Sequence, residues 1–293
     1  MEDFFTLDLL TRILRMSTPL IFAALGGLIC ERSGVINIAL EGLMLIGAFF
    51  AVAGTYWTGN VFFGLMIGII CAMIGSMIHA VWSITFRGNQ IVVGTAVNLI
   101  AMGLTAFLVK AIWDTAGGSD RVHSLPRFWG MSILVPIAFA LVPIVAFFLF
   151  KTKQGLRLQA CGEHPQAAVS AGINITLYRY GAVLASGALG GLGGAYLSIG
   201  NLNYFTLDMT NGRGFIALAA VILGAWTPWG ALGAALLFGA AEGIQVQGQS
   251  TPGFPISSDL LVALPYIVTL IAITLFVKAR SGPAGLGEHA TTS

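Results

Sequence analysis

The chain has 293 residues, of which 57% are hydrophobic and only 9% are charged, and its mean hydropathy is +0.88. A soluble domain carries roughly 25% charged residues to cover its surface, so this composition excludes an ordinary soluble protein and predicts one embedded in lipid. The formal net charge of +2 is too small to indicate a nucleic acid as the partner.

Apolar runs separated by charged residues predict the topology, because a spanning helix needs about 20 mostly apolar residues. The predicted fold class is all-α, a polytopic transmembrane helical bundle of about nine spans that forms one domain over residues 1–293. The predicted spans lie near 8–29, 34–54, 61–85, 89–110, 132–150, 180–200, 215–229, 231–248 and 259–277. Glycine and proline interrupt the run near 215–229, which predicts a broken or re-entrant helix there.

Basic residues indicate which side of the membrane each loop faces. The long polar loop 151–179 and the tail after the last span are predicted to be cytoplasmic, and counting spans back from Lys151 places the N-terminus outside. This topology puts eight Lys and Arg residues inside and six outside, so the positive-inside rule by itself does not decide the orientation. Near the N-terminus, Glu2 and Asp3 stand where a signal peptide would be basic, so we expect the first helix to be retained.

Small residues at four-residue spacing predict close helix contacts, since they let backbones approach one another in lipid. Three such ladders occur: Gly187, Gly191 and Ala195; Gly190 and Gly194; and Ala235, Gly239 and Gly243. The three cysteines, Cys30, Cys71 and Cys161, are far apart and odd in number, which supports neither a disulfide framework nor a zinc site. We interpret all of these as packing residues.

Polar side chains inside a membrane cost roughly 2.5 kcal/mol or more unless they are paired, so each one suggests a function. Asn37 and Glu41, four residues apart in the second predicted span, would share one helix face and either line the solute path or clamp neighbouring helices. Glu242 and Gln245 mark a polar stripe on a later span. Asn98 is a lone polar group, as is His79, which we interpret as a packing residue. The candidates for the translocation path are Asn37, Glu41, Asn98, Glu242 and Gln245.

The cytoplasmic loop 151–179 contains a helix-start signal, because Glu163-His164-Pro165 precedes Gln166–Ala171 and Gly172 follows. A short amphipathic helix bracketed by basic residues suits docking onto a soluble cytoplasmic protein. The chain has no G-x-x-x-x-G-K-[ST] loop, so we do not expect it to bind and hydrolyse ATP itself. It also lacks a nucleophile beside a base, which makes a membrane-embedded enzyme a weak alternative.

Three stretches resemble the permeases of the branched-chain amino acid, ribose and nucleoside ABC importer family. They are Glu31–Gly47, Gly155–Ile173 and Gly212–Gly230, which follow one another in the same order as in the family. The first and the third stretch are most similar to the nucleoside or simple-sugar permeases. By position, the resemblance assigns coupling to the ATPase to Gly155, Arg157, Gly162, Glu163, His164, Pro165, Ala168 and Gly172. His164 stands where the family often has Asn.

The resemblance implies a type II ABC importer in the bacterial inner membrane. In such a system two permease subunits, often different chains, are moved by two cytoplasmic ATPase subunits that bind ATP and Mg²⁺ and are supplied by an extracytoplasmic substrate-binding lipoprotein. The permease itself would need no cofactor. We therefore expect transport of a small neutral polar solute, a nucleoside or otherwise a simple sugar, because the spans offer few buried cations to hold an anion. The alternatives are a branched-chain amino acid permease and an ion-coupled secondary transporter that uses Glu41 or Glu242.

Overall fold

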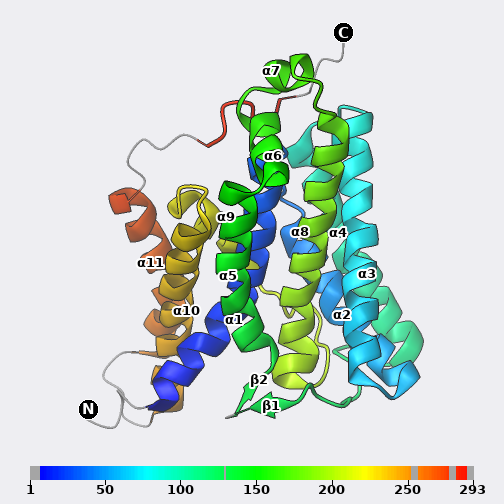
Figure 1. Ribbon diagram of the computed structural model, residues 1–293. Helices are drawn as coiled ribbons and strands as arrows, with labels where there is room; N and C mark the ends of the chain where they lie inside the picture. Colours follow the sequence, from blue (N-terminus) through cyan, green and yellow to red (C-terminus); the bar gives the residue numbers. More distant parts are fainter. Residues whose placement is uncertain (1–6, 129, 252–256, 277–281, 289–293) are drawn as a thin grey trace.

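A computed structural model describes residues 7–128, 130–251, 257–276 and 282–288. Long helices dominate it, with two short π-helical turns (η) and one small hairpin (Figure 1). In chain order the elements are α1 (Leu7–Arg32), α2 (Leu40–Thr58), α3 (Val61–Ala80), η2 (Val81–Thr85), α4 (Gln90–Trp113), β1 (Arg127–Phe128), β2 (Met131–Ser132), α5 (Leu134–Lys151), α6 (Lys153–Glu163), α7 (Pro165–Ser170), α8 (Ile175–Ala195), η3 (Tyr196–Leu202), α9 (Arg213–Leu223), α10 (Pro228–Ser250) and α11 (Ser258–Phe276).

Each of the nine predicted apolar runs corresponds to a helix in the described part of the chain. Seven of these helices are long and apolar enough to cross a membrane, while α9 and α11 contribute shorter apolar helices. The prediction of an all-α bundle with about nine spans is therefore confirmed. The broken span is also present, because α9 has only 11 residues and a non-helical segment precedes it.

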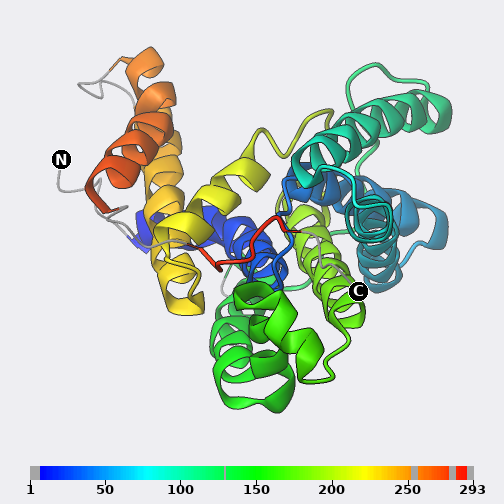
Figure 2. The ribbon, with the colours of Figure 1, turned by 90° about the horizontal axis from the view of Figure 1, so that it is seen from above.

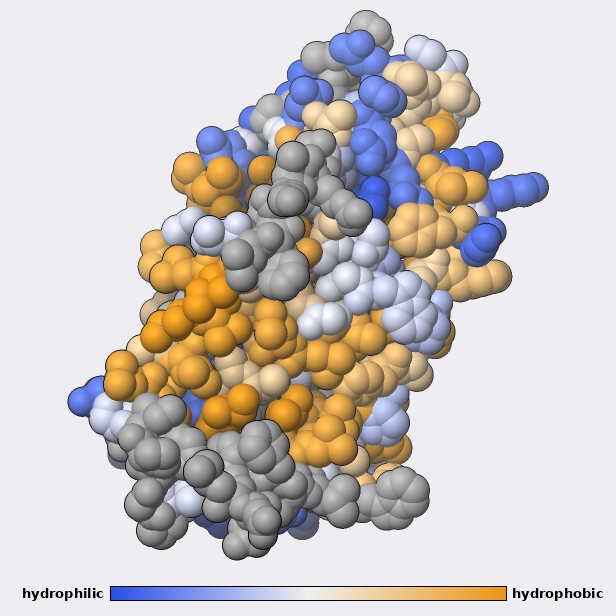
Figure 3. All heavy atoms as spheres, turned by 90° about the vertical axis from the view of Figure 1, so that its left-hand side faces the viewer, coloured by the Kyte–Doolittle hydropathy of each residue, from blue (hydrophilic) through white to orange (hydrophobic). Residues whose placement is uncertain are grey.

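Two helices form the centre of the bundle. α1 packs against α8, α9 and α10, and α8 also packs against α2 and α3. Seen along the bundle, α2, α3 and α4 lie on one side of this centre and α10 and α11 lie on the other (Figure 2). Figure 3 shows an apolar band across the middle of one face of the molecule, with hydrophilic side chains gathered at the end that carries α6 and α7. α1 begins at the opposite end, as expected when five spans precede the α6–α7 loop (Figure 1).

The small-residue ladders allow backbones to touch. A Cβ atom added to Gly194 of α8 would lie 1.8 Å from the carbonyl oxygen of Met44 in α2, and one added to Gly239 of α10 would lie 2.0 Å from Ser17 Oγ in α1. Neither distance can be accommodated, so any larger residue would separate these helices. The prediction that these ladders serve packing is confirmed at both contacts.

Candidate functional site

The second predicted span is interrupted near its start. Residues 35–37 are neither helix nor turn, Gly34 has φ +92°, and α2 begins only at Leu40. The expectation that Asn37 and Glu41 share one face of a helix is therefore wrong. Apolar composition alone predicted a helix here, but the tight turn at Gly34 sends the chain back into the bundle in an extended conformation. Asn37 consequently points to α8 and Glu41 to α9.

Non-helical backbone is tolerated at membrane depth only where protein groups satisfy its N–H and C=O groups. Here polar side chains from two neighbouring helices do so. Gln90 Oε1 accepts from the Ile36 amide at 2.7 Å, and His79 Nε2 lies 3.0 Å from the Ile36 carbonyl oxygen. Asn98 bridges the break, because its Nδ2 donates to the Ile38 carbonyl at 2.9 Å and its Oδ1 accepts from the Gly42 amide at 2.8 Å.

The broken span α9 begins inside the bundle, and Glu41 caps it. The Glu41 carboxylate accepts from the Gly212 amide at 2.8 Å and from the Gly214 amide at 2.6 Å. A Cβ atom at Gly214 would lie 2.4 Å from the Glu41 backbone nitrogen, so this close approach requires glycine. Eleven helical residues rise about 16 Å, half of a hydrocarbon core about 30 Å thick, so α9 by itself is too short to cross the membrane.

The second charged contact of this region pairs α9 with α10. Arg213 donates to Glu242 Oε2 from Nε at 3.3 Å and from Nη2 at 3.2 Å. Both side chains are largely buried, at 20% and 11% exposure. Gln245 follows Glu242 along α10 and is half-buried. We call residues 33–42 and 210–214, together with Glu242, the central junction.

Charge in the central junction is balanced by the protein itself. The N-terminus of a helix carries roughly half a positive charge, and the Glu41 carboxylate neutralises it at α9. Glu242 neutralises Arg213. Two buried polar atoms of the junction, Asn37 Oδ1 and Thr210 Oγ1, have no hydrogen-bond partner among the described residues, although Asn37 Nδ2 donates to Ser186 Oγ at 2.8 Å.

At the other predicted functional region, the loop between α5 and α8 folds into two helices. Thr152 caps α6 by accepting from the Gly155 amide at 3.1 Å, and Pro165 occupies the first turn of α7. α7 ends before Gly172, which has φ +74°. The prediction of a short helix after His164 is therefore confirmed; α6, which precedes it, was not predicted. Ala168 packs inward, while Gln166, Ala167, Val169 and Ser170 are exposed on the outer surface.

The predicted coupling residues at the end of α6 contact the end of α1 and the C-terminal tail. Glu163 pairs with Arg32 at 3.4 Å and accepts from the Ala284 amide at 3.3 Å. The Gly285 amide donates to the Gly162 carbonyl at 2.8 Å, and the Gly287 amide donates to the Gly34 carbonyl at 3.0 Å. Tail residues 282–288 thus join the α6–α7 loop to the segment that leads into the central junction, and they cross above the bundle centre (Figure 2).

Sequence reasoning missed several residues of this region. Arg179 was assigned to the cytoplasmic loop, yet it is only 2% exposed and donates to the carbonyls of Ser33 at 3.2 Å and Glu288 at 2.7 Å. Trp226 Nε1 donates to Glu31 Oε2 at 2.5 Å, and Arg32 Nε donates to the Trp226 carbonyl at 2.8 Å. No periodicity marks these contacts, which join segments more than 100 residues apart. The tail cations Lys278 and Arg280 lie outside the described residues.

Apolar helices long enough to cross a membrane, a capped broken span and a pair of short helices at one end define a multi-pass membrane protein. Its sequence matches the profile of the family described as branched-chain amino acid transport system / permease component over residues 9–274, and the chain belongs to that family.

Three relatives cover nearly the whole chain. The guanosine ABC transporter permease protein NupQ of Bacillus subtilis is 41% identical, with 92% of each chain covered. The nucleoside ABC transporter permease protein NupC of Lactococcus lactis subsp. cremoris is 35% identical, with 96% of each chain covered. The putative glucose ABC transporter permease protein TsgC13 of Haloferax volcanii is 32% identical, covering 93% of this chain and 92% of its own.

Proposed function

We propose that this permease carries a nucleoside into a bacterial cell, driven by ATP hydrolysis in partner subunits. The observation that carries the substrate class is similarity to the guanosine and nucleoside permeases over more than nine-tenths of both chains. The similarity to a putative glucose permease keeps a simple sugar as the second candidate.

The charge balance of the central junction supports a neutral solute. An anion in the membrane needs a compensating cation. Here Glu41 already occupies the N-terminus of α9, and Glu242 already pairs with Arg213. A phosphorylated nucleoside would have to displace one of these carboxylates, whereas an uncharged nucleoside or sugar would not. Asn37 Oδ1 and Thr210 Oγ1 offer an acceptor and a hydroxyl for hydrogen bonds to such a solute once the path opens.

The exposed α6–α7 loop and the family together suggest which proteins assemble with this permease. Cytoplasmic ATPase subunits, which bind ATP and Mg²⁺, would dock on the exposed face of α7. A second permease, expected to be a different chain, would complete the membrane unit in the inner membrane, and a substrate-binding lipoprotein would deliver the solute at the opposite end.

The contacts of Gly162 and Glu163 suggest how motion reaches the solute. A displacement of α6–α7 pulls on Arg32, Gly34 and the tail, and residues 35–39 connect this point directly to Glu41. Because Glu41 holds the start of α9, a shift of α2 moves both broken spans together. The expected result is alternate access at the central junction.

Uptake of radiolabelled guanosine by cells that carry the complete system tests the proposal. We expect uptake to be lost with a hydrolysis-deficient ATPase and with a Glu163→Ala, Pro165→Gly variant that still reaches the membrane. Lys151→Gln is the matched control and should retain uptake, because Lys151 is exposed and takes no part in the contacts of Gly162 and Glu163. Uptake that survives loss of the ATPase would instead favour an ion-coupled transporter. Transport of glucose or a branched-chain amino acid without guanosine would overturn the substrate class alone.

A further inference from the structure

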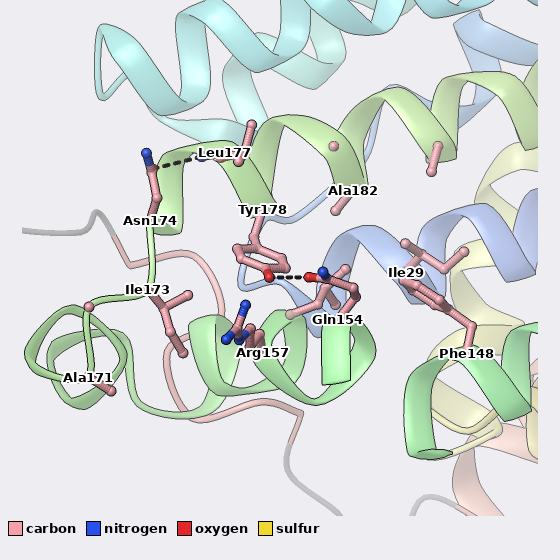
Figure 4. A pocket seen from close by; sticks show the side chains of 14 residues that line it. Ile29, Phe148, Gln154, Arg157, Ala171, Ile173, Asn174, Leu177, Tyr178 and Ala182 are labelled. Atoms are coloured by element: carbon pink, nitrogen blue, oxygen red, sulfur yellow. Dashed lines mark hydrogen bonds between the residues drawn. The ribbon is translucent and has the colours of Figure 1, made fainter. Parts of the chain in front are cut away.

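A pocket of about 900 Å³ lies between α5–α6 and α8, at the end of the bundle that carries the coupling loop. Gln154, Arg157 and Tyr178 line its rim, and Tyr178 Oη donates to Gln154 Oε1 (Figure 4). Ile29 and Phe148 line its inner part together with the small residues of α8.

The inner part of the pocket exists because α8 presents only small side chains there, beyond Leu177 and Tyr178 at the rim. Gly181, Ala182 and Ala185 form the wall, and a Cβ atom added to Gly181 would meet no heavy atom within 4 Å. Packing therefore does not require glycine at this position. An apolar hollow of this size in the membrane is filled by another molecule, since protein interiors contain few voids larger than a water molecule.

The depth of the pocket matches one leaflet of a bilayer. Ala182 and Ala185 are seven and ten residues beyond the start of α8 at Ile175, which corresponds to about 10–15 Å along the helix. Half of the hydrocarbon core is about 15 Å thick. With the start of α8 at headgroup level, the rim of the pocket lies among the headgroups and its inner part among the acyl chains.

The rim carries one charge, and its sign is positive. Arg157 is exposed, lines the pocket, and has no hydrogen bond or ion pair among the described residues. No carboxylate lines the pocket beside it. The site can therefore match the phosphate of a lipid but offers no partner to the cationic group of a zwitterionic headgroup.

We propose that this pocket binds an anionic phospholipid. Its phosphate pairs with Arg157, and an acyl chain lies against Phe148, Ile29 and Ala185. Inorganic phosphate would leave the apolar part empty, so the shape favours a lipid. The bound lipid holds α6 against α8. Arg157 would then help to position the α6–α7 loop through the lipid, rather than by direct contact with the ATPase.

The test uses the complete transporter in nanodiscs that contain equal amounts of phosphatidylglycerol and phosphatidylcholine, followed by native mass spectrometry of the lipid retained after transfer to detergent. We expect wild type to retain phosphatidylglycerol preferentially. Arg157→Gln should reduce its retention about fivefold, since a cation near the surface contributes roughly 1 kcal/mol to the binding of anionic lipid. Gly181→Phe should abolish retention by filling the pocket. Lys153→Gln removes the same charge from the same helix outside the pocket and should have no effect.

Equal retention of the two lipids, or equal loss with Arg157→Gln and Lys153→Gln, would overturn the proposal. Retention that persists in Gly181→Phe would place the lipid elsewhere and overturn it too. Displacement of the lipid by millimolar inorganic phosphate would show that the site recognises phosphate alone. If the complete complex retains no lipid while the isolated chain does, a partner subunit covers the pocket and the proposed occupant is wrong.

Discussion

Glu41 connects the two broken spans, because it lies in the first turn of α2 and caps the start of α9. Its carboxylate is buried and accepts two backbone N–H groups at the start of α9. Glu41→Ala should therefore leave both amides unsatisfied. Because hydrogen bonds to charged groups contribute roughly 1.5–3 kcal/mol each, we expect a loss of about 3 kcal/mol or more. The thermal midpoint of the purified complex measures this effect.

Glu41→Gln is the matched variant for that experiment, since its amide oxygen still accepts one hydrogen bond. It should fall between wild type and Glu41→Ala in stability. An unchanged midpoint in Glu41→Ala would contradict the role of Glu41 as a cap.

Cys161 should be chemically inert in the folded transporter. Burial raises the pKa of the Cys161 thiol above its ordinary value, and the nearby Arg179 guanidinium lowers it by a smaller amount. The thiol is therefore protonated at neutral pH and becomes nucleophilic only as the pH rises past its raised pKa. We expect no labelling of Cys161 by a maleimide at pH 7.5 until the protein is denatured, measured by the mass of a peptide that contains it. Rapid labelling of the native protein would show that α6 opens.

Individual residue types were predictable from the sequence, but their partners were not. A carboxylate in an apolar span needs a partner, so Glu41 and Glu242 could be selected from the sequence as candidate functional residues. That Glu41 caps a helix 171 positions later could not be inferred, because no local pattern encodes the approach of Gly212 and Gly214. The amide of Asn98 likewise appeared isolated, since the backbone groups that it bonds belong to another span.

At the scale of elements, the tail 282–288 connects the α6–α7 loop to the segment before α2, and this connection can be tested directly. Truncation after residue 281 removes the hydrogen bonds of the tail to Gly34, Gly162 and Glu163 and leaves the described spans intact. We expect normal membrane levels and continued ATPase activity in the complex, with uptake reduced at least severalfold. Uptake and ATP turnover by the same preparation measure the coupling.

A point variant isolates the same contact. A Cβ atom at Gly285 would lie 2.8 Å from Pro165 Cδ, so Gly285→Val should reproduce the loss of uptake. Ala284→Val alters an exposed side chain one position earlier and should retain it. If both variants behave like wild type, the tail has no part in coupling.

Helices with strong local signals were predicted well, and irregular segments were not. α7 could be predicted because Pro165 and Gly172 mark its ends directly in the sequence. The break at residues 33–39 lacks such a marker except for Gly34, and its apolar residues satisfy a helix pattern equally well. The partners that stabilise the extended form, Gln90, His79 and Asn98, come from later spans. Tertiary contacts therefore decide the conformation.

For the whole molecule, the crossing of α5 places the α6–α7 loop and residues 114–128 on opposite sides of the membrane. In a chain whose three cysteines are replaced, Ala167→Cys and His123→Cys provide exposed probes of the two sides. We expect a membrane-impermeant maleimide to label His123→Cys in intact spheroplasts and Ala167→Cys only in inside-out vesicles. The reverse pattern would invert the topology, and labelling of both from one side would change the number of crossings.

The non-helical segment 33–39 also constrains the order in which the protein can be made. Its backbone is bonded by side chains of α3, α4 and α8, and Gly34 accepts from Gly287, which follows all the described spans in the sequence. When α1 and α2 leave the ribosome, none of these partners exists. The first hairpin therefore cannot form its final contacts until α8 and residues 282–288 have been made. Assembly of this permease is thus a late, concerted event rather than a span-by-span process.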